Sequence, residues 1–285
     1  MDELRRRYLQ QLIELGEKDL VLSETAPLSE AAERGQGASE GALRAVRPSE
    51  RPAPATPRPA PTPERPAPAT PRPTSAPIPI GIIADAPARG DLFTADPIAA
   101  LHSLEQIATV VDACRKCGLG HSRLHSVPGQ GSAQARMVVV GEAPGATEDE
   151  QGLAFVGRAG KLLTDILKAI DLSRDEVFIC NVLKCRPPDN RDPEPLEVAA
   201  CSPYLHRQLE LIRPKVVLAM GKNAARALLG TNAALGDLRQ KVHRYRGIPL
   251  IVTYHPAALL RNPHWKRPTW DDIRLARRIF DDQAV

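Results

Sequence analysis

Residues 137–160 read M-V-V-V-G-E-A-P-G-A-T-E-D-E-Q-G-L-A-F-V-G-R-A-G, and this stretch decides the fold. The apolar, β-branched run Met137–Val140 predicts a strand that is buried on both faces. Gly141, Pro144 and Gly145 end the strand and predict a tight loop before the next helix. The loop carries several carboxylates at the carboxyl end of the strand, where ligands bind in open α/β sheets.

Strand and helix patterns alternate along the chain from residue 96 onward. The strand candidates are residues 136–141, 177–182, 215–221 and 249–254. The helix candidates are residues 158–170, 194–212, 222–229 and 269–282. Strands that alternate with helices predict a parallel sheet covered on both faces. We therefore expect an α/β domain over residues 96–285, with three α/β/α layers around a central four-stranded parallel sheet.

The overall composition narrows the class of protein. The 285 residues carry a formal net charge of +4, which argues against binding through bulk electrostatics and favours a local basic patch. The chain has no run of about 18 apolar residues, so we expect no membrane span. Five cysteines without an export signal favour metal ligands or free thiols over disulfides, and we expect a cytoplasmic protein.

The N-terminal third has two parts of its own. Apolar residues at helical spacing predict an amphipathic helix within residues 1–25, which docks on a protein partner, docks on the folded domain, or frays. Residues 26–95 are rich in proline and alanine, and the segment 51–59 recurs unchanged as 65–73. Proline at this density favours polyproline II, so we expect residues 26–95 to form a disordered, semi-stiff linker.

Four of the five cysteines form a candidate ligand set. Cys114 and Cys117 make a C-x2-C pair, and Cys185 and Cys201 follow at a distance. Four cysteines fit either tetrahedral zinc or an iron–sulfur cluster, and spacing alone does not choose between them. Cys180 lies inside an apolar strand candidate, where we expect a buried and inert thiol.

Two polar residues stand where later strands end. Asn181 closes the strand candidate 177–182, and His255 follows the candidate 249–254 directly before a proline. Asparagine at a strand end is often only a turn former, and a lone histidine is often structural. Because the carboxyl ends of parallel strands meet at one edge of the sheet, we expect both side chains near the loop after Gly141.

These elements resemble, in the same order, the motifs of the family 4 uracil-DNA glycosylases, the iron–sulfur members of the uracil-DNA glycosylase superfamily. The matching segments are residues 137–160, the four cysteines, Asn181-Val-Leu-Lys-Cys-Arg-Pro-Pro, and Thr253-Tyr-His-Pro. The resemblance implies an enzyme that flips deoxyuridine out of DNA and hydrolyses its N-glycosidic bond. Free uracil and an abasic site result, which starts base excision repair. It also implies that Cys114, Cys117, Cys185 and Cys201 hold a 4Fe–4S cluster.

The resemblance assigns roles to three side chains around the base. Phe155 stacks on the uracil ring, and His255 donates to uracil O2 while negative charge builds on the departing base. Asn181 reads the base edge, because its amide offers one donor and one acceptor to the O4 and N3–H of uracil. Cytosine presents the reverse pattern, and leaving buried polar groups unpaired is costly.

The other expected site residues follow from the same resemblance. Families that use a loop aspartate to orient water carry it at the position of Ala143, so Glu142 is the candidate here, unless leaving-group stabilisation suffices with a loosely held water. Glu148 could crowd C5 of the base and exclude thymine. Ala154 stands where the family usually has proline, so we expect a less rigid loop than in the family. The expected substrate contacts are Gly141, Ala143, Gly145, Glu148, Phe155, Asn181 and His255.

The His-Pro loop continues into an expected DNA contact. Leu259 or Leu260 would fill the space that the flipped base leaves, beside Arg261. Between Arg239 and Arg278 there are ten Lys or Arg residues and two acidic residues, which predicts a basic face for the phosphate backbone. We expect single- or double-stranded DNA that contains uracil as the partner, and a monomeric enzyme.

A rival interpretation is a zinc-stabilised, non-catalytic DNA-binding module that the proline-rich arm links to replication or repair machinery. A nucleotide-binding α/β enzyme is disfavoured, because no glycine-rich phosphate fingerprint follows the first strand.

Overall fold

The computed structural model describes residues 79–84 and 97–282 of the chain. The predicted helix of residues 1–25 and most of the predicted linker of residues 26–95 lie outside these described residues. Residues 80–84 of that predicted linker form a strand, β1 (Ile80–Ala84), which joins the sheet of the folded domain. None of the helices in the described residues is both long and apolar enough to cross a membrane.

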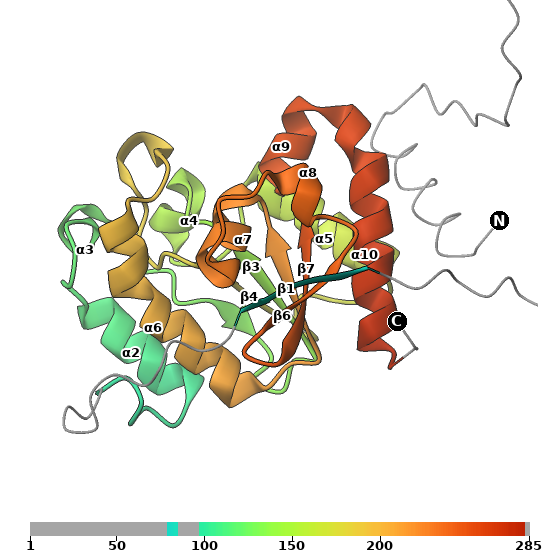
Figure 1. Cartoon of the computed structure of the whole chain (residues 1–285). Coiled ribbons are helices and arrows are strands. Elements are labelled where there is room, and N and C mark those ends of the chain that lie inside the picture. The colour runs from blue at the N-terminus through green and yellow to red at the C-terminus, as the bar shows by residue number, and fades with distance from the viewer. Residues whose placement is uncertain (1–78, 85–96, 283–285) are drawn as a thin grey trace, which may run out of the picture. The chain divides into compact units, whose positions relative to one another are not determined.

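A seven-stranded sheet forms the centre of the domain, in the order β1-β6-β7-β5-β3-β4-β2 (Figure 1). The remaining strands are β2 (Gln130–Gly131), β3 (Met137–Gly141), β4 (Phe178–Asn181), β5 (Val216–Met220), β6 (Val242–Tyr245) and β7 (Ile248–Thr253). The four neighbours β7, β5, β3 and β4 are parallel, as the alternating pattern predicts. The sheet is wider than the predicted four strands, because β2 and β6 add antiparallel partners and β1 pairs in parallel with β6.

Local contacts explain why the extra strands β6 and β1 join the sheet. β6 and β7 form a hairpin whose two turn residues, Arg246 and Gly247, both have positive φ. β1 is fixed by the buried His243, which accepts a hydrogen bond from the Ile82 amide (2.9 Å) and donates to the Leu238 carbonyl (2.6 Å). A Cβ at Gly81 would lie 2.4 Å from the same imidazole, so only glycine allows this close approach.

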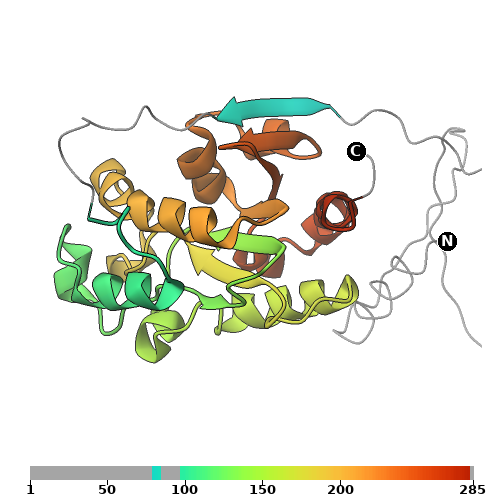
Figure 2. The same ribbon diagram turned by 90° about the horizontal axis from the view of Figure 1, so that it is seen from below.

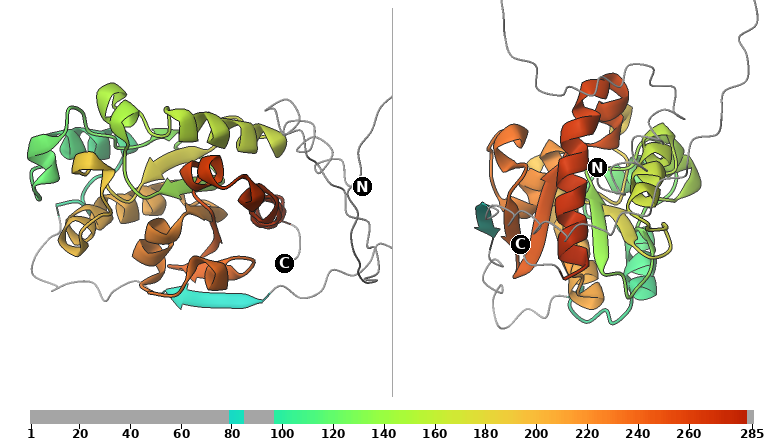
Figure 3. Two further views of the ribbon diagram at one scale, coloured as in Figure 1. Left: turned by 90° about the horizontal axis from the view of Figure 1, so that it is seen from above. Right: turned by 90° about the vertical axis from the view of Figure 1, so that its right-hand side faces the viewer.

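Helices cover both faces of the sheet. They are α2 (Leu104–Ala113), α3 (Leu119–Ser122), α4 (Ala146–Gln151), α5 (Arg158–Ala169), α6 (Pro195–Ile212), α7 (Lys222–Leu229), α8 (Leu235–Leu238), α9 (Pro256–Arg261) and α10 (Lys266–Phe280). Apolar side chains of α6, α7 and α8 share one core with Val138 and Val140 of β3. Figures 2 and 3 show α6 and α10 on opposite sides of the sheet, which gives the predicted three layers.

A second, smaller core lies between α2, α3 and the outer side of α6. It contains Ile107 and Val111 of α2, Leu119 of α3 and Tyr204 of α6, together with Leu183 from the loop after β4. The loop after β4 therefore lies between two packed regions, the main sheet and this smaller core. That position brings residues from the end of β4 next to the segment that carries the C-x2-C pair.

Candidate functional site

A cleft of about 440 Å³ opens at the carboxyl ends of β3, β4 and β7. It is lined by Glu142, Ala143, Pro144, Gly145, Glu148, Phe155, Ala159, Asn181, Pro187, Asn190, Arg191, Asp192, His255, Ala257, Ala258 and Arg261. Seven of these residues were expected to contact the uracil base or to take part in the reaction. They follow the ends of three separate strands. The strand register brings the first two of these segments together, because Gly141 of β3 lies opposite Asn181 of β4 in the parallel ladder.

Asn181 presents an unsatisfied amide to the cleft. Its side chain is 1% exposed, and its Oδ1 atom has no hydrogen-bond partner among the described residues. An unpaired buried polar atom typically costs about 1–3 kcal/mol, so this atom is suited to a partner that arrives with a ligand. Gly141 permits the arrangement, since a Cβ there would lie 2.3 Å from Oδ1 of Asn181 and 2.5 Å from the Phe155 ring.

Phe155 is held in a strained turn beside His255. Its φ is 53°, and its ring centroid lies 5.5 Å from that of His255 with the planes 31° apart. The backbone of Phe155 passes so close to α5 that a Cβ at Gly160 would lie 1.8 Å from its carbonyl oxygen. The carbonyl of Ala154 accepts hydrogen bonds from Arg174 (2.7 Å) and Gln130 (3.1 Å). These contacts stiffen the loop where proline is missing.

The carboxylate of Glu148 accepts hydrogen bonds from three backbone amides. One oxygen accepts from the amides of Val156 and Gly157, each at 2.9 Å, and the other accepts from the amide of Gly145 at 3.2 Å. The side chain thus ties the start of α4 to the turn that carries Phe155. Glu148 also lines the cleft, and its exclusion of thymine by crowding C5 of the base stays a prediction.

His255 is arranged as a neutral donor. Its Nδ1 accepts a hydrogen bond from the Ala257 amide (3.2 Å), so the ring proton belongs on Nε2. Burial and, to a smaller extent, the positive charge of Arg261 lower the pKa of His255 to about 4, while Glu148 opposes the shift. The imidazole is therefore uncharged at neutral pH and has one N–H to offer at the cleft.

Glu142 is half-buried and lines the cleft. Burial raises the pKa of its carboxyl group above the ordinary value, and the negative charge of Asp192 acts in the same direction. A hydrogen bond with the side chain of Asn223 and the positive charge of Lys222 act against this shift. A carboxyl group of this kind can change protonation state closer to neutral pH than a solvated glutamate does.

The two leucines of the expected wedge have different environments. Leu259 of α9 is 1% exposed and packs into the core, so its assignment as a DNA contact is wrong. Leu260 is 40% exposed, and the neighbouring Arg261 is exposed and lines the cleft. The two leucines are neighbours in α9, and the turn of the helix directs one toward the core and the other toward solvent. The sequence pattern does not show which of them faces outward. In the basic run, Arg239 is likewise buried, where it pairs with Asp272 at 2.6 Å.

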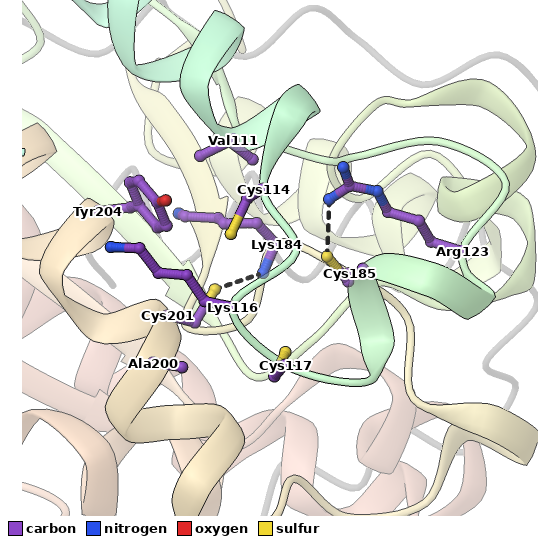
Figure 4. A pocket seen from close by; sticks show the side chains of 11 residues that line it. Val111, Cys114, Lys116, Cys117, Arg123, Lys184, Cys185, Ala200, Cys201 and Tyr204 are labelled. Atoms are coloured by element: carbon purple, nitrogen blue, oxygen red, sulfur yellow. Dashed lines mark hydrogen bonds between the residues drawn. The ribbon is translucent and has the colours of Figure 1, made fainter.

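A second pocket gathers the four predicted cysteine ligands. Cys114, Cys117, Cys185 and Cys201 all line one small space between α2, α3 and α6, and Figure 4 shows their sulfur atoms around it. Cys180 is fully buried in β4 and does not line this pocket, as predicted for an inert thiol. Within residues 79–84 and 97–282, no three histidine, cysteine or acidic side chains are grouped as a site for a single metal ion.

Positive charges surround the four cysteines. Lys116, Arg123 and Lys184 line the same pocket, and Arg123 donates to the Cys185 sulfur at 2.9 Å. Burial raises the pKa of the Cys201 thiol to about 12, and the nearby cationic Lys184 opposes this shift. A pocket lined by four cysteines, of which Cys185 and Cys201 are buried, and by three cations could hold a metal-containing group that binds four thiolates and carries negative charge.

The family of the chain follows from comparison with known proteins. The family model of the uracil DNA glycosylase superfamily matches residues 128–275. The type-4 uracil-DNA glycosylase of Sulfurisphaera tokodaii is 45% identical over 188 residues, which cover 63% of this chain and 86% of that protein. The chain belongs to the type-4 uracil-DNA glycosylases.

Further relatives include a second type-4 enzyme and a type-5 enzyme. The type-4 enzyme of Thermotoga maritima is 40% identical over 185 residues, which cover 64% of this chain and 96% of that protein. A type-5 uracil-DNA glycosylase of Pyrobaculum aerophilum is 36% identical over 152 residues, which cover 47% of this chain and 66% of that protein.

Some site residues of this type-4 glycosylase escape sequence reasoning. Pro187, Asn190, Arg191 and Asp192 line the cleft, although the sequence patterns assign them no role in the site. Their place in the loop that follows Asn181 is a usable signal, since this loop leaves a strand end at the active edge of the sheet. Arg174 gives no such signal, because it reaches the loop of Phe155 through tertiary contact alone.

The close approach at Gly141 yields a direct test. Gly141→Ala should displace the side chains of Asn181 and Phe155, and we expect uracil excision to fall at least about a hundredfold because both must lie in register with the base. The matched control is Gly236→Ala in α8, where a Cβ would meet no atom within 4 Å. Single-turnover excision and thermal unfolding of both variants would check this. Full activity of Gly141→Ala would contradict the close packing.

Proposed function

We propose that the cleft of this type-4 uracil-DNA glycosylase holds a flipped-out uracil and that its side chains cleave the N-glycosidic bond. The enzyme removes uracil from DNA and leaves an abasic site for base excision repair. Flipping costs a few kcal/mol of stacking and pairing, which contacts to the extruded base must offset. The buried and unpaired Oδ1 of Asn181, beside Phe155 and His255, is the observation that carries the proposal.

Asn181 would select the base by hydrogen-bond pattern. Its amide can accept from N3–H and donate to O4 of uracil, whereas cytosine presents the opposite pattern. A bidentate pair of this kind is worth about 1–3 kcal/mol of discrimination. Because the side chain is buried at the end of a β-strand, it has little freedom to turn over and accept the wrong base.

Phe155 and His255 would act on the ring and on its developing charge. The ring of Phe155 offers a stacking surface in the same cleft, and its strained backbone is held before the substrate arrives. The Nε2–H of His255 would donate to uracil O2 as the N-glycosidic bond breaks. A neutral donor suits this task, because it stabilises the anionic leaving group and keeps its own proton.

Glu142 would hold or activate the attacking water. It lies at the cleft wall, and its contact with Asn223 fixes the orientation of its carboxyl group. In the ionised form it can accept a proton from water and stabilise positive charge on the sugar. The exposed Leu260 would enter the space that the base vacates, and Arg261 would contact the DNA backbone at the mouth of the cleft.

The four-cysteine pocket would hold a 4Fe–4S cluster. The donor set fits the group, since four sulfurs and three cations line one pocket. When bound, the cluster supplies four iron–thiolate bonds that join the C-x2-C segment to the loop after β4 and to α6. Together with the cleft, these features favour a cluster-containing enzyme over a zinc-stabilised, non-catalytic DNA-binding module.

Compartment and assembly form a smaller part of the proposal. We propose that the enzyme is a cytoplasmic monomer that acts on single- or double-stranded DNA containing uracil. Residues 1–25 are proposed to bind a protein partner. The proposal for this segment rests on its amphipathic sequence alone.

Base reading and leaving-group stabilisation can be separated by substitution. Asn181→Asp replaces a donor by an acceptor, so we expect weaker binding of uracil-containing DNA and some excision of cytosine. His255→Ala keeps the reading edge, and we expect binding to persist while the chemical step slows about 10²–10³-fold. Single-turnover excision and DNA binding would be measured for both. Excision by His255→Ala at the parent rate would remove the His-Pro loop from the mechanism.

The pH dependence of uracil excision should follow the titration of Glu142. As the pH falls through the raised pKa of Glu142, the carboxylate becomes protonated and excision should decrease, whereas His255, with a pKa of about 4, stays neutral over most of this window. Glu142→Gln should slow excision at neutral pH and remove this acid limb. Glu150→Gln, at an exposed position of α4, should keep the parent profile. An unchanged acid limb in Glu142→Gln would assign the titration to another group.

The ligand set predicts which cysteines retain iron. Alanine at Cys114, Cys117, Cys185 or Cys201 should each cause loss of iron and of visible absorption, and each should lower the melting temperature. Cys180→Ala is the matched control and should keep iron and activity, since it lies outside the pocket. Metal analysis of the purified proteins decides the outcome. Zinc instead of iron in the parent protein, or iron loss from Cys180→Ala, would refute the assignment.

A further inference from the structure

A bridge of five residues, 181–185, connects the cleft with the four-cysteine pocket. The amides of Val182 and Leu183 donate to the carbonyls of Gly141 and Glu142, each at 3.0 Å, so this bridge extends the pairing of β3 and β4 beyond the strands. At its other end, the Lys184 amide donates to the Cys201 sulfur at 3.2 Å (Figure 4). The base-reading residue and a cysteine ligand thus stand at the two ends of one anchored segment.

Lys184 is the unusual member of this bridge. Its side chain is 1% exposed, and its ammonium group donates to the main-chain carbonyl of Asn181 at 2.8 Å and to Oε1 of Gln208 at 2.7 Å. Gln208 is equally buried and donates through Nε2 to the carbonyl of Pro128 at 2.7 Å. The amide of Gln208 is therefore oriented by a second contact, and its oxygen faces the lysine.

The charge of Lys184 needs a partner that these contacts do not supply. A buried ammonium group is costly unless it is hydrogen-bonded and paired with a negative charge, and both of its acceptors are neutral oxygens. The side chain also lines the four-cysteine pocket. Thiolates that bind a metal group there would supply the missing negative charge. A lysine at this point is thus suited to a loaded pocket.

We propose that Lys184 is a positioning residue that fixes Asn181 for base recognition by tying it to the loaded four-cysteine pocket. This inference rests on the proposed role of Asn181 as the reader of the uracil edge. Lys184 holds the main-chain carbonyl of Asn181, and the charge of the metal group holds Lys184. The metal site then contributes to catalysis through the placement of a base-reading residue.

The test compares two lysines that line the same pocket. Lys184→Met removes the ammonium group and keeps an unbranched apolar side chain. Lys116→Met is the matched control, because it removes a cation from the same pocket whose ammonium group lies over the Tyr204 ring, 5.2 Å from the ring centroid. For both variants we would measure iron content, visible absorption, the inhibition constant of free uracil, and kcat and KM on a uracil oligonucleotide.

Lys184→Met should retain iron, because all four cysteines remain, while the inhibition constant of uracil rises about tenfold, as expected for loss of a hydrogen bond from a charged group. Lys116→Met should leave the inhibition constant at the parent value. An unchanged inhibition constant for Lys184→Met, or an equal rise in Lys116→Met, would overturn the proposal. A purely structural role would lower the melting temperature without changing uracil affinity of the folded protein.

A measurement on the unaltered holoenzyme covers the case in which Lys184→Met does not fold. If Lys184 links the two sites, saturating free uracil should change the visible circular dichroism of the iron–sulfur chromophore, because coupling between two sites is reciprocal. An unchanged spectrum at saturation would overturn the link. Failure of the underlying assignment is distinguishable, since Asn181→Asp would then bind free uracil as tightly as the parent.

Discussion

The site depends on the parallel pairing of β3 with β4 in one register. That register sets Gly141 opposite Asn181, and the missing side chain of the glycine leaves room for both the asparagine amide and the ring of Phe155. A shift of the ladder by one residue would turn each side chain to the other face of the sheet. The cleft and the proposed base-reading and stacking side chains therefore all depend on a backbone arrangement that apolar strand residues stabilise.

Electrostatics complete what the backbone arranges. The cleft combines a carboxyl group whose pKa is raised by burial with an imidazole whose pKa is lowered by burial. Desolvation disfavours the charged form of each group. The same low-polarity surroundings therefore raise the pKa of Glu142 and lower the pKa of His255. In the four-cysteine pocket the balance differs, because Lys116, Arg123 and Lys184 line the pocket together with the cysteines. Positive charge there would compensate thiolates that hold a metal group, whereas the cleft presents groups whose uncharged forms are favoured.

Sequence patterns predict the parallel core and the loops of the site, because apolar strand runs and polar strand ends are local features. They miss β2 and β6, which are short, and β1, which lies in a proline-rich segment without strand periodicity. They do not decide between Leu259 and Leu260, since the choice depends on how α9 rotates against the core. The contacts of Glu148 and Lys184 are missed for a similar reason. Long polar side chains choose partners by tertiary geometry, and spacing along the chain carries little of that information.

The loop that presents Phe155 obtains its stiffness from outside itself. Proline restricts a chain in its folded and unfolded states alike, whereas Ala154 gains its restraint only from Arg174 and from Gln130 of β2. These partners become available after the edge strand and the segment between α5 and β4 have docked. A chain in which either element has opened would still contain the whole loop and would lack its external restraint, so the position of Phe155 depends on the completed fold and not on the loop alone.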